Sequence, residues 1–279
     1  MVSRFRHTLK RHVSYIALSV FAAVGVWTTA NPAVLGFSIW DLIPSAVQLI
    51  QLSTMSDSQE VAIGEQINDR LLDHDITLYN NRQVTEYVDR IGQRLVRVSD
   101  RSDLPFTFQV VRDDNINAFA TLGGFVYINT GLIRQADNEA ELAGVIAHEI
   151  GHIVERHVID NMKQAAIAQG VLDAAGVDPN LLVQIGYELA LNRPRSRRAE
   201  YEADEVGLSL IQTAGYAPAG MVNFYHNLTS GPSIPEFLST HPDTEDRIVR
   251  LRERLDPATA TQGDGLDEGY YRRQIQPLL

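Results

Sequence analysis

Residues 138–168 decide the fold and read NEAELAGVIAHEIGHIVERHVIDNMKQAAIA. Asn138 is a typical helix N-cap, and Glu141 follows three residues later, at the spacing of a capping box. Apolar residues then recur with helical spacing, at Leu142, Val145, Ile146, Ile150, Ile153 and Val154. The pattern predicts a long helix with one apolar face.

This helix carries the motif His148-Glu149-x-x-His152. Residues four apart project from the same side of a helix, so both imidazoles can reach one metal ion. Glu149 lies beside them, where it can reach a water molecule activated by the metal. Zinc is the expected ion because neutral imidazoles and a carboxylate suit it. The alternative is a partly buried helix with solvated histidines, so the prediction depends on a third ligand.

One possible third ligand is a histidine further along the same segment. That arrangement needs a glycine at position 155 and a histidine at position 158, but the chain has Glu155 and Val158. His157 is one position away, and we interpret it as a structural residue.

The other possible third ligand is a glutamate on a second helix. Residues 196–207 read SRRAEYEADEVG and begin a helical stretch that should end near Gly215. Glu200 and Asp204 are four residues apart on one face. Glu200 can therefore bind the metal while Asp204 accepts a hydrogen bond from the far nitrogen of a ligand histidine. Glu202 points elsewhere and is expected to be a solvated or structural carboxylate.

The pattern before residue 138 is different. Phe106, Phe108 and Val110 alternate with other residues, which predicts a strand, and two more short strands are expected at 117–120 and 125–129. Helices are predicted after the caps at residues 56 and 81. A helix-rich domain with one small β-sheet belongs to the α+β class.

Three segments resemble a known family when they are taken in order. They are AHEIGHIVERH at 147–157, SRRAEYEADEVG at 196–207 and STHPDTEDRI at 239–248. Two further segments match, SQEVAIGEQ at 58–66 and NAFATLGGFVYINTGLI at 117–133. The chain resembles zinc metallopeptidase family forty-eight, which includes the HtpX, BepA and CAAX-prenyl-protease types. The resemblance covers about residues 56–255 and implies a gluzincin-type peptidase fold.

The resemblance also implies roles for the motif residues. His148, His152 and Glu200 would bind one zinc ion per chain, and Glu149 would be the catalytic acid/base. The segment Asn117, Ala118, Phe119 and Ala120 matches an edge strand that binds the peptide substrate as an added strand.

Two later residues match the third motif. His241 would either bind zinc as a fourth ligand that holds the enzyme inactive or assist the oxyanion during catalysis; the alternative is a histidine that only caps a helix before Pro242. Arg247 would pair with Asp204 or Glu200, because carboxylates buried around zinc need a compensating cation.

Composition excludes several functional classes. The formal net charge is −11, although the first eleven residues contain four basic side chains, so no basic face is available for a nucleic-acid partner. The chain has no cysteine. This excludes a disulfide scaffold, a thiolate zinc site and a cysteine nucleophile.

The N-terminus resembles a targeting segment. A basic stretch at 4–12 precedes an uncharged run at 13–40. The most apolar part of this run, 16–27, is followed by small residues at 28–30. We expect a signal peptide or membrane anchor at 1–30, an apolar linker or interfacial helix at 31–55, the catalytic domain at 56–255 and a polar tail at 256–279. The catalytic domain should therefore be exported, to the periplasm or another extracytoplasmic compartment.

Together these features predict a zinc-dependent metalloendopeptidase. Its substrates would be exported or membrane-associated proteins that are unfolded or damaged, as in cell-envelope quality control. Its other partner would be the membrane, through the N-terminal segment. The alternative is a zinc-bound chaperone or assembly factor with a latent, closed active site.

Overall fold

The computed structural model describes residue 52 and residues 54–169, 178–192, 196–229 and 235–279. The segment expected at 1–30 and most of the linker expected at 31–55 lie outside these ranges. Within them, no helix is both long and apolar enough to cross a membrane.

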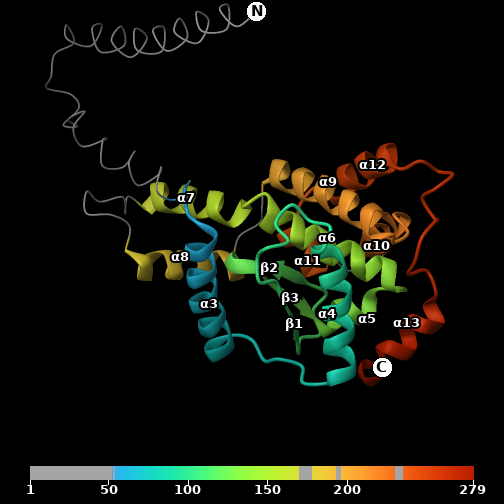
Figure 1. Ribbon diagram of the computed structural model, residues 1–279, viewed down its shortest axis with the longest axis horizontal. Coiled ribbons are helices and arrows are strands. Elements are labelled where there is room, and N and C mark those ends of the chain that lie inside the picture. Colours follow the sequence, from blue (N-terminus) through green and yellow to red (C-terminus); the bar gives the residue numbers. More distant parts are fainter. Residues whose placement is uncertain (1–51, 53, 170–177, 193–195, 230–234) are drawn as a thin grey trace, which may run out of the picture. The chain divides into compact units, whose positions relative to one another are not determined.

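The sheet has three strands, as the sequence predicted, and their order is β1-β3-β2 (Figure 1). Strand β1 (Thr107–Val111) runs parallel to β3 (Phe125–Asn129), with Val110 opposite Ile128. Strand β2 (Ala118–Ala120) runs antiparallel to β3 on its other side. In the described part of the chain β2 pairs with β3 alone, so β2 is an edge strand of the sheet.

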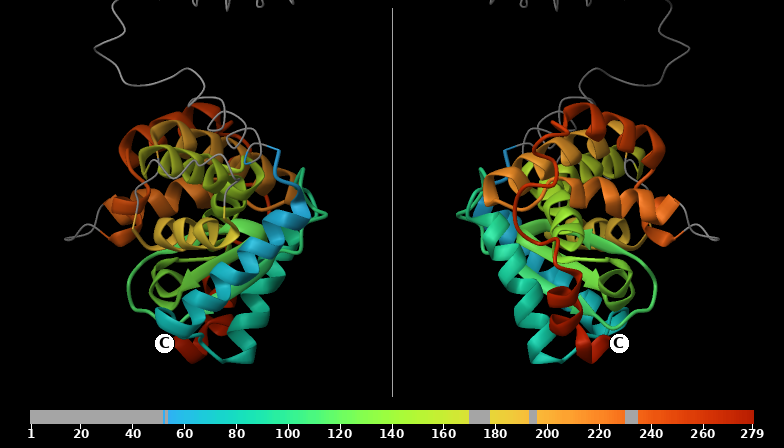
Figure 2. Two further views of the ribbon diagram at one scale, coloured as in Figure 1. Left: turned by 90° about the vertical axis from the view of Figure 1, so that its left-hand side faces the viewer. Right: turned by 90° about the vertical axis from the view of Figure 1, so that its right-hand side faces the viewer.

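Helix α6 (Glu139–Val154) is the predicted central helix, and it is buried over almost its whole length. Asn138 caps it by accepting a hydrogen bond from the Glu141 backbone N–H, as expected. The return bond differs from the predicted capping box, because the Glu141 carboxylate accepts from the Asp137 N–H. Helix α6 lies between the sheet and helices α9 (Arg197–Ala214) and α10 (Ala219–Thr229) (Figures 1 and 2).

Two apolar clusters hold these layers together. The larger is formed by α4 (Arg82–Val96), the sheet, α6, α9 and α10, and the smaller by α3 (Asp57–His74), α7 (His157–Gln169) and α8 (Pro179–Asn192) with parts of the sheet. Short helices complete the described part, namely η3 (Leu122–Gly124), α5 (Thr130–Gln135), α11 (Glu236–Thr240) and α12 (Thr244–Arg254).

The segment 256–279 differs from the polar tail that the sequence predicts. It contains α13 (Glu268–Gln274) and η4 (Gln276–Leu278), and it passes along the domain to reach α4 (Figure 1). Tyr271 is fully buried and donates a hydrogen bond to the Ile133 carbonyl over 2.6 Å. Gly265 adopts φ +95° and accepts from the Ala140 N–H, at a place where a Cβ would lie 2.8 Å from the same nitrogen. The segment is thus part of the folded domain.

Candidate active site

Helices α6 and α9 bring the three predicted metal ligands together. The Nε2 atoms of His148 and His152 lie 3.0 Å apart on one face of α6. Glu200, in the first turn of α9, places Oε2 at 3.4 Å from the His148 Nε2 and Oε1 at 3.4 Å from the His152 Nε2. All three residues are fully buried.

His241 joins this group from the end of α11. Its Nδ1 lies 3.1 Å from the His148 Nε2 and 3.1 Å from the Glu200 Oε2. Its backbone N–H donates to the Phe237 carbonyl, and its ring stacks on the Phe237 ring at 4.3 Å. The His241 side chain therefore points into the ligand group, although its backbone also caps α11.

The geometry of these donors fits zinc. One donor atom from each of His148, His152, Glu200 and His241 lies within 4.8 Å of the others. Tetrahedral zinc with bonds of about 2.0–2.1 Å has ligand atoms roughly 3.3 Å apart. The donor atoms here are spaced at 3.0–3.4 Å, which agrees with that value. The site buries three carboxylates, from Glu149, Glu200 and Asp204, and one guanidinium, from Arg247. A divalent cation would balance the two excess formal negative charges.

Asp204 contacts the far side of the His148 ring. Its Oδ1 lies 2.9 Å from the His148 Nδ1, and the fully buried Arg247 guanidinium donates to both Asp204 oxygens over 2.7 Å. Tyr225, which the sequence did not single out, completes this cluster: its hydroxyl donates to Asp204 over 3.1 Å and accepts from Arg247 over 2.7 Å. Burial raises the pKa of Asp204, but Arg247 and His148 lower it more, to about 2.

Arg247 also reaches the third ligand. Its Nη1 lies 2.8 Å from the Glu200 Oε2. Burial raises the pKa of Glu200, whereas His241 and Arg247 lower it more, so this pKa lies well below its ordinary value. Burial and Arg247 lower the pKa of His148, but its contacts with Asp204 and Glu200 raise it above the ordinary value.

Glu149 lies next to the four donors. It is fully buried, and its Oε1 is 3.3 Å from the His241 Nε2. From this position the Glu149 carboxylate can reach a water molecule bound to a metal ion held by the four donors.

Two further residues lie behind His152. The His152 Nδ1 is 2.9 Å from the Nδ1 of His157, and the Nε2 of His157 is 3.1 Å from Glu202. The sequence pointed to neither role, because His157 is one position away from the third-histidine spacing and Glu202 was expected to point elsewhere. A spacing of five residues also does not place two side chains on one helix face. The chain turns sharply at Arg156, which has φ +57°, and this turn brings His157 back to His152.

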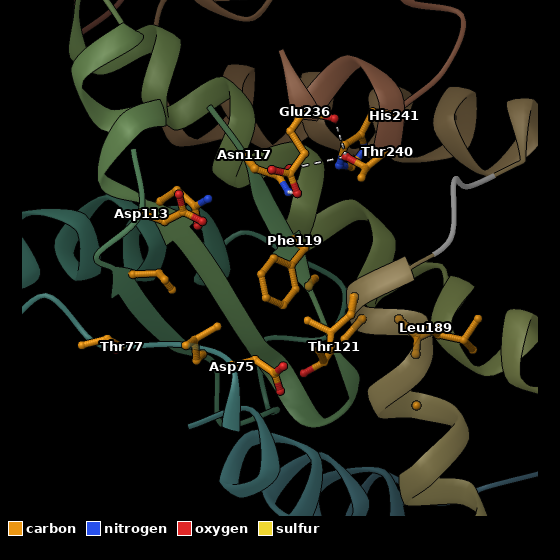
Figure 3. Close-up of a pocket in the computed structure, with 18 of the residues that line it drawn as sticks. Asp75, Thr77, Asp113, Asn117, Phe119, Thr121, Leu189, Glu236, Thr240 and His241 are labelled. Atoms are coloured by element: carbon orange, nitrogen blue, oxygen red, sulfur yellow. Dashed lines mark hydrogen bonds between the residues drawn. The ribbon is translucent and has the colours of Figure 1, made fainter. Parts of the chain in front are cut away.

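A cavity of about 240 Å³ adjoins His241 (Figure 3). Strand β2 and the residues beside it form one wall, with Asn117, Phe119 and Thr121, and Leu189 of α8 lies across from them. The Asn117 amide donates to Glu236 over 3.0 Å, and Thr240 donates to the Asn117 side-chain oxygen over 3.4 Å.

The predicted substrate strand thus borders this cavity. The Ala118 carbonyl lies 3.5 Å from the His241 Nε2, and Ala120 is among the lining residues. The cavity therefore extends from His241 along β2.

Comparison with known proteins gives consistent matches. The chain is 34% identical over 221 residues to the beta-barrel assembly-enhancing protease of Escherichia coli, a match that covers 72% of this chain and 45% of that protein. It is 32% identical over 182 residues to the mitochondrial metalloendopeptidase OMA1 of Schizosaccharomyces pombe, covering 62% of this chain and 54% of that protein. It is 26% identical over 227 residues to the E. coli metalloprotease YcaL, a match that covers 76% of this chain and 86% of that protein. The chain thus spans about half the length of the first two relatives.

A family model also matches most of the described domain. Residues 82–255 match peptidase family M48, a range that contains His148, Glu149, His152 and Glu200 as well as His241. Family members use zinc, and the buried donor group suits that ion. The chain belongs to peptidase family M48.

Proposed function

We propose that this chain is a zinc-dependent metalloendopeptidase, with His148, His152 and Glu200 as the zinc ligands and Glu149 as the catalytic acid/base. The observation that carries the proposal is the convergence of these buried donors at spacings of 3.0–3.4 Å, with the Glu149 carboxylate beside them. Membership of a peptidase family supports the same reaction.

Glu149, Asp204 and Arg247 have different roles in the proposed peptide hydrolysis. Zinc, when bound, supplies Lewis acidity that lowers the pKa of water toward neutrality and polarises a peptide carbonyl. Glu149 accepts the proton of the attacking water and passes it to the leaving amine. Asp204 and Arg247 keep the His148 ring in the orientation that directs its Nε2 inward.

The edge strand β2 is the proposed binding site for the substrate backbone. An extended peptide added to β2 would gain main-chain hydrogen bonds, which depend little on sequence. This suits unfolded or damaged proteins, and the names of the relatives as proteases support a protein substrate. We infer that the substrates are exported proteins in cell-envelope quality control, with residues 1–30 directing export or anchoring the chain and 56–255 forming the catalytic domain.

We assign His241 the role of a gate. Its Nδ1 lies as close to the His148 Nε2 as the other donors do, at 3.1 Å, which supports binding at a fourth position. With four protein ligands no position is open for water. Movement of the segment between α11 and α12 would withdraw the imidazole and open the site.

Cleavage of casein by the purified full-length chain tests this function. A zinc chelator should abolish cleavage and added zinc should restore it, whereas Glu149→Gln should be inactive throughout. A zinc-loaded parent protein that cleaves nothing under any condition would favour the chaperone alternative.

A further inference from the structure

The turn between α6 and α7 is a constrained structure. Arg156 occupies the left-handed region at φ +57°, which is unfavourable for a residue with a side chain. Its guanidinium donates to Glu60 over 3.0 Å and to the Met55 carbonyl over 2.8 Å. Glu60 is buried and is also held by Arg101 at 2.8 Å. These contacts stabilise a turn that directs His157 at a metal ligand.

The contacts of His157 define a chain of donors and acceptors. A neutral imidazole that offers its Nε2 lone pair to a metal carries its proton on Nδ1. The His152 Nδ1 would therefore donate to the His157 Nδ1, 2.9 Å away. His157 would then carry its own proton on Nε2, which faces the Glu202 carboxylate at 3.1 Å. In this arrangement each N–H faces an acceptor: the His152 Nδ1–H faces the His157 Nδ1, and the His157 Nε2–H faces the Glu202 carboxylate.

We propose that His157 is a positioning residue that fixes the orientation and tautomer of His152, and that Glu202 fixes the tautomer of His157. The two ligands on α6 are then oriented by different residues. Asp204, held by Arg247, orients His148. His157, held by Glu202, orients His152. The inference rests on the proposed metal site. Residues that orient a ligand typically change metal affinity 10- to 100-fold when they are replaced.

Two substitutions at His157 test the acceptor directly. His157→Phe keeps a buried ring but removes the acceptor, and it should raise the zinc Kd about 10- to 100-fold. His157→Asn keeps an amide oxygen near the position of Nδ1, so its zinc Kd should lie within about threefold of the parent value. The Kd is measured by competition with a chromogenic chelator, on full-length protein. The Tm of each metal-free variant, measured in parallel, reports any loss of folding separately.

The hydrogen-bonded chain from His152 through His157 to Glu202 is called the relay below. Glu202→Gln tests its last residue without disturbing the core, since the Glu202 side chain is 37% exposed. The amide of Gln can either accept a hydrogen bond from His157 or donate one to it, so it no longer selects one tautomer of His157. The zinc Kd should therefore rise, but by less than in His157→Phe. Glu205→Gln is the matched control, because Glu205 lies on the same helix but pairs with Arg250 and Arg254. It should bind zinc like the parent.

Parent-like zinc affinity in both His157→Phe and Glu202→Gln would overturn the proposal. So would equal weakening by the Asn and Phe replacements, because that result would give His157 a packing role only. If the parent cleaves casein and binds zinc, and these variants bind zinc with the same Kd, the proposed role of His157 and Glu202 is refuted while the metal site stands. A parent that binds no zinc would refute the metal site and the relay with it.

Discussion

Arg247 links the candidate zinc ligands to the rest of the site. Its guanidinium is fully buried, contacts Glu200 and both oxygens of Asp204, and lies 4.6 Å from the centre of the Tyr225 ring. A planar guanidinium can bind two carboxylates in a fixed geometry, which an ammonium group cannot do. One residue therefore sets the relative position of a zinc ligand on α9 and the aspartate that orients His148.

The gate role proposed for His241 can be tested by removing its imidazole. If it is a gate, His241→Ala should keep zinc through the other three ligands and should cleave casein faster than the parent. If it assists the oxyanion, the same change should lower kcat roughly 10²-fold. The kcat of zinc-loaded protein decides, and a kcat unchanged within about twofold would exclude both roles.

Glu141, at the start of α6, should make stability depend on pH. It is buried, and burial raises its pKa to about 7, although the Asp137 N–H acts in the opposite direction. A pKa raised on folding means that the folded state favours the proton, so stability is lost as pH rises through 7. From pH 5 to pH 8 the parent should lose about 2–3 kcal/mol more unfolding free energy than Glu141→Gln. Urea unfolding measures this, and parallel pH profiles would contradict it.

At the scale of elements, the close crossing of α6 and α9 creates the metal site. Gly151 and Ala203 meet there, next to the ligands His152 and Glu200. A Cβ on Gly151 would lie 2.6 Å from the Ala203 carbonyl oxygen, and that backbone atom cannot move without its helix.

Gly151→Ala should therefore push α9 away from α6. We expect a loss of about 1–3 kcal/mol of unfolding free energy from overpacking, together with weaker zinc binding. Gly144→Ala is the control, because its Cβ would meet Met221 at 2.8 Å on α10, a helix that carries none of the proposed zinc ligands. Urea unfolding and zinc titration should show that both variants are destabilised and that zinc affinity falls only in Gly151→Ala. Equal zinc affinity in the two would contradict this account.

The elements that the sequence predicts are those with a strong local pattern. The strand at 107–111 follows from alternation, the strands at 118–120 and 125–129 lie within or at the two short segments expected from the sequence, and the start of α6 follows from the Asn138 cap. The role of His157 could not be predicted, because a left-handed turn at an arginine has no sequence signature and depends on tertiary contacts with Glu60. The packing of 256–279 was missed because its few buried side chains, such as Tyr271, stand in a polar stretch.

At the scale of the whole molecule, the basic stretch before residue 13 and the small residues at 28–30 lead us to expect a catalytic domain outside the cytoplasm. Protease added to intact spheroplasts should degrade the body of the protein. A periplasmic marker protein must be degraded in the same sample. Full protection of this chain beside a degraded marker would show that the domain is cytoplasmic.

The central claim is that His148, His152 and Glu200 bind zinc while Glu149 performs the chemistry without binding it. Zinc content measured on purified parent, Glu149→Gln and Glu200→Ala, with casein cleavage on the same samples, tests this claim most directly. We expect one zinc per chain in the parent and in Glu149→Gln, with cleavage by the parent alone, and neither zinc nor cleavage in Glu200→Ala. A zinc-free Glu149→Gln beside a fully loaded Glu200→Ala would contradict it.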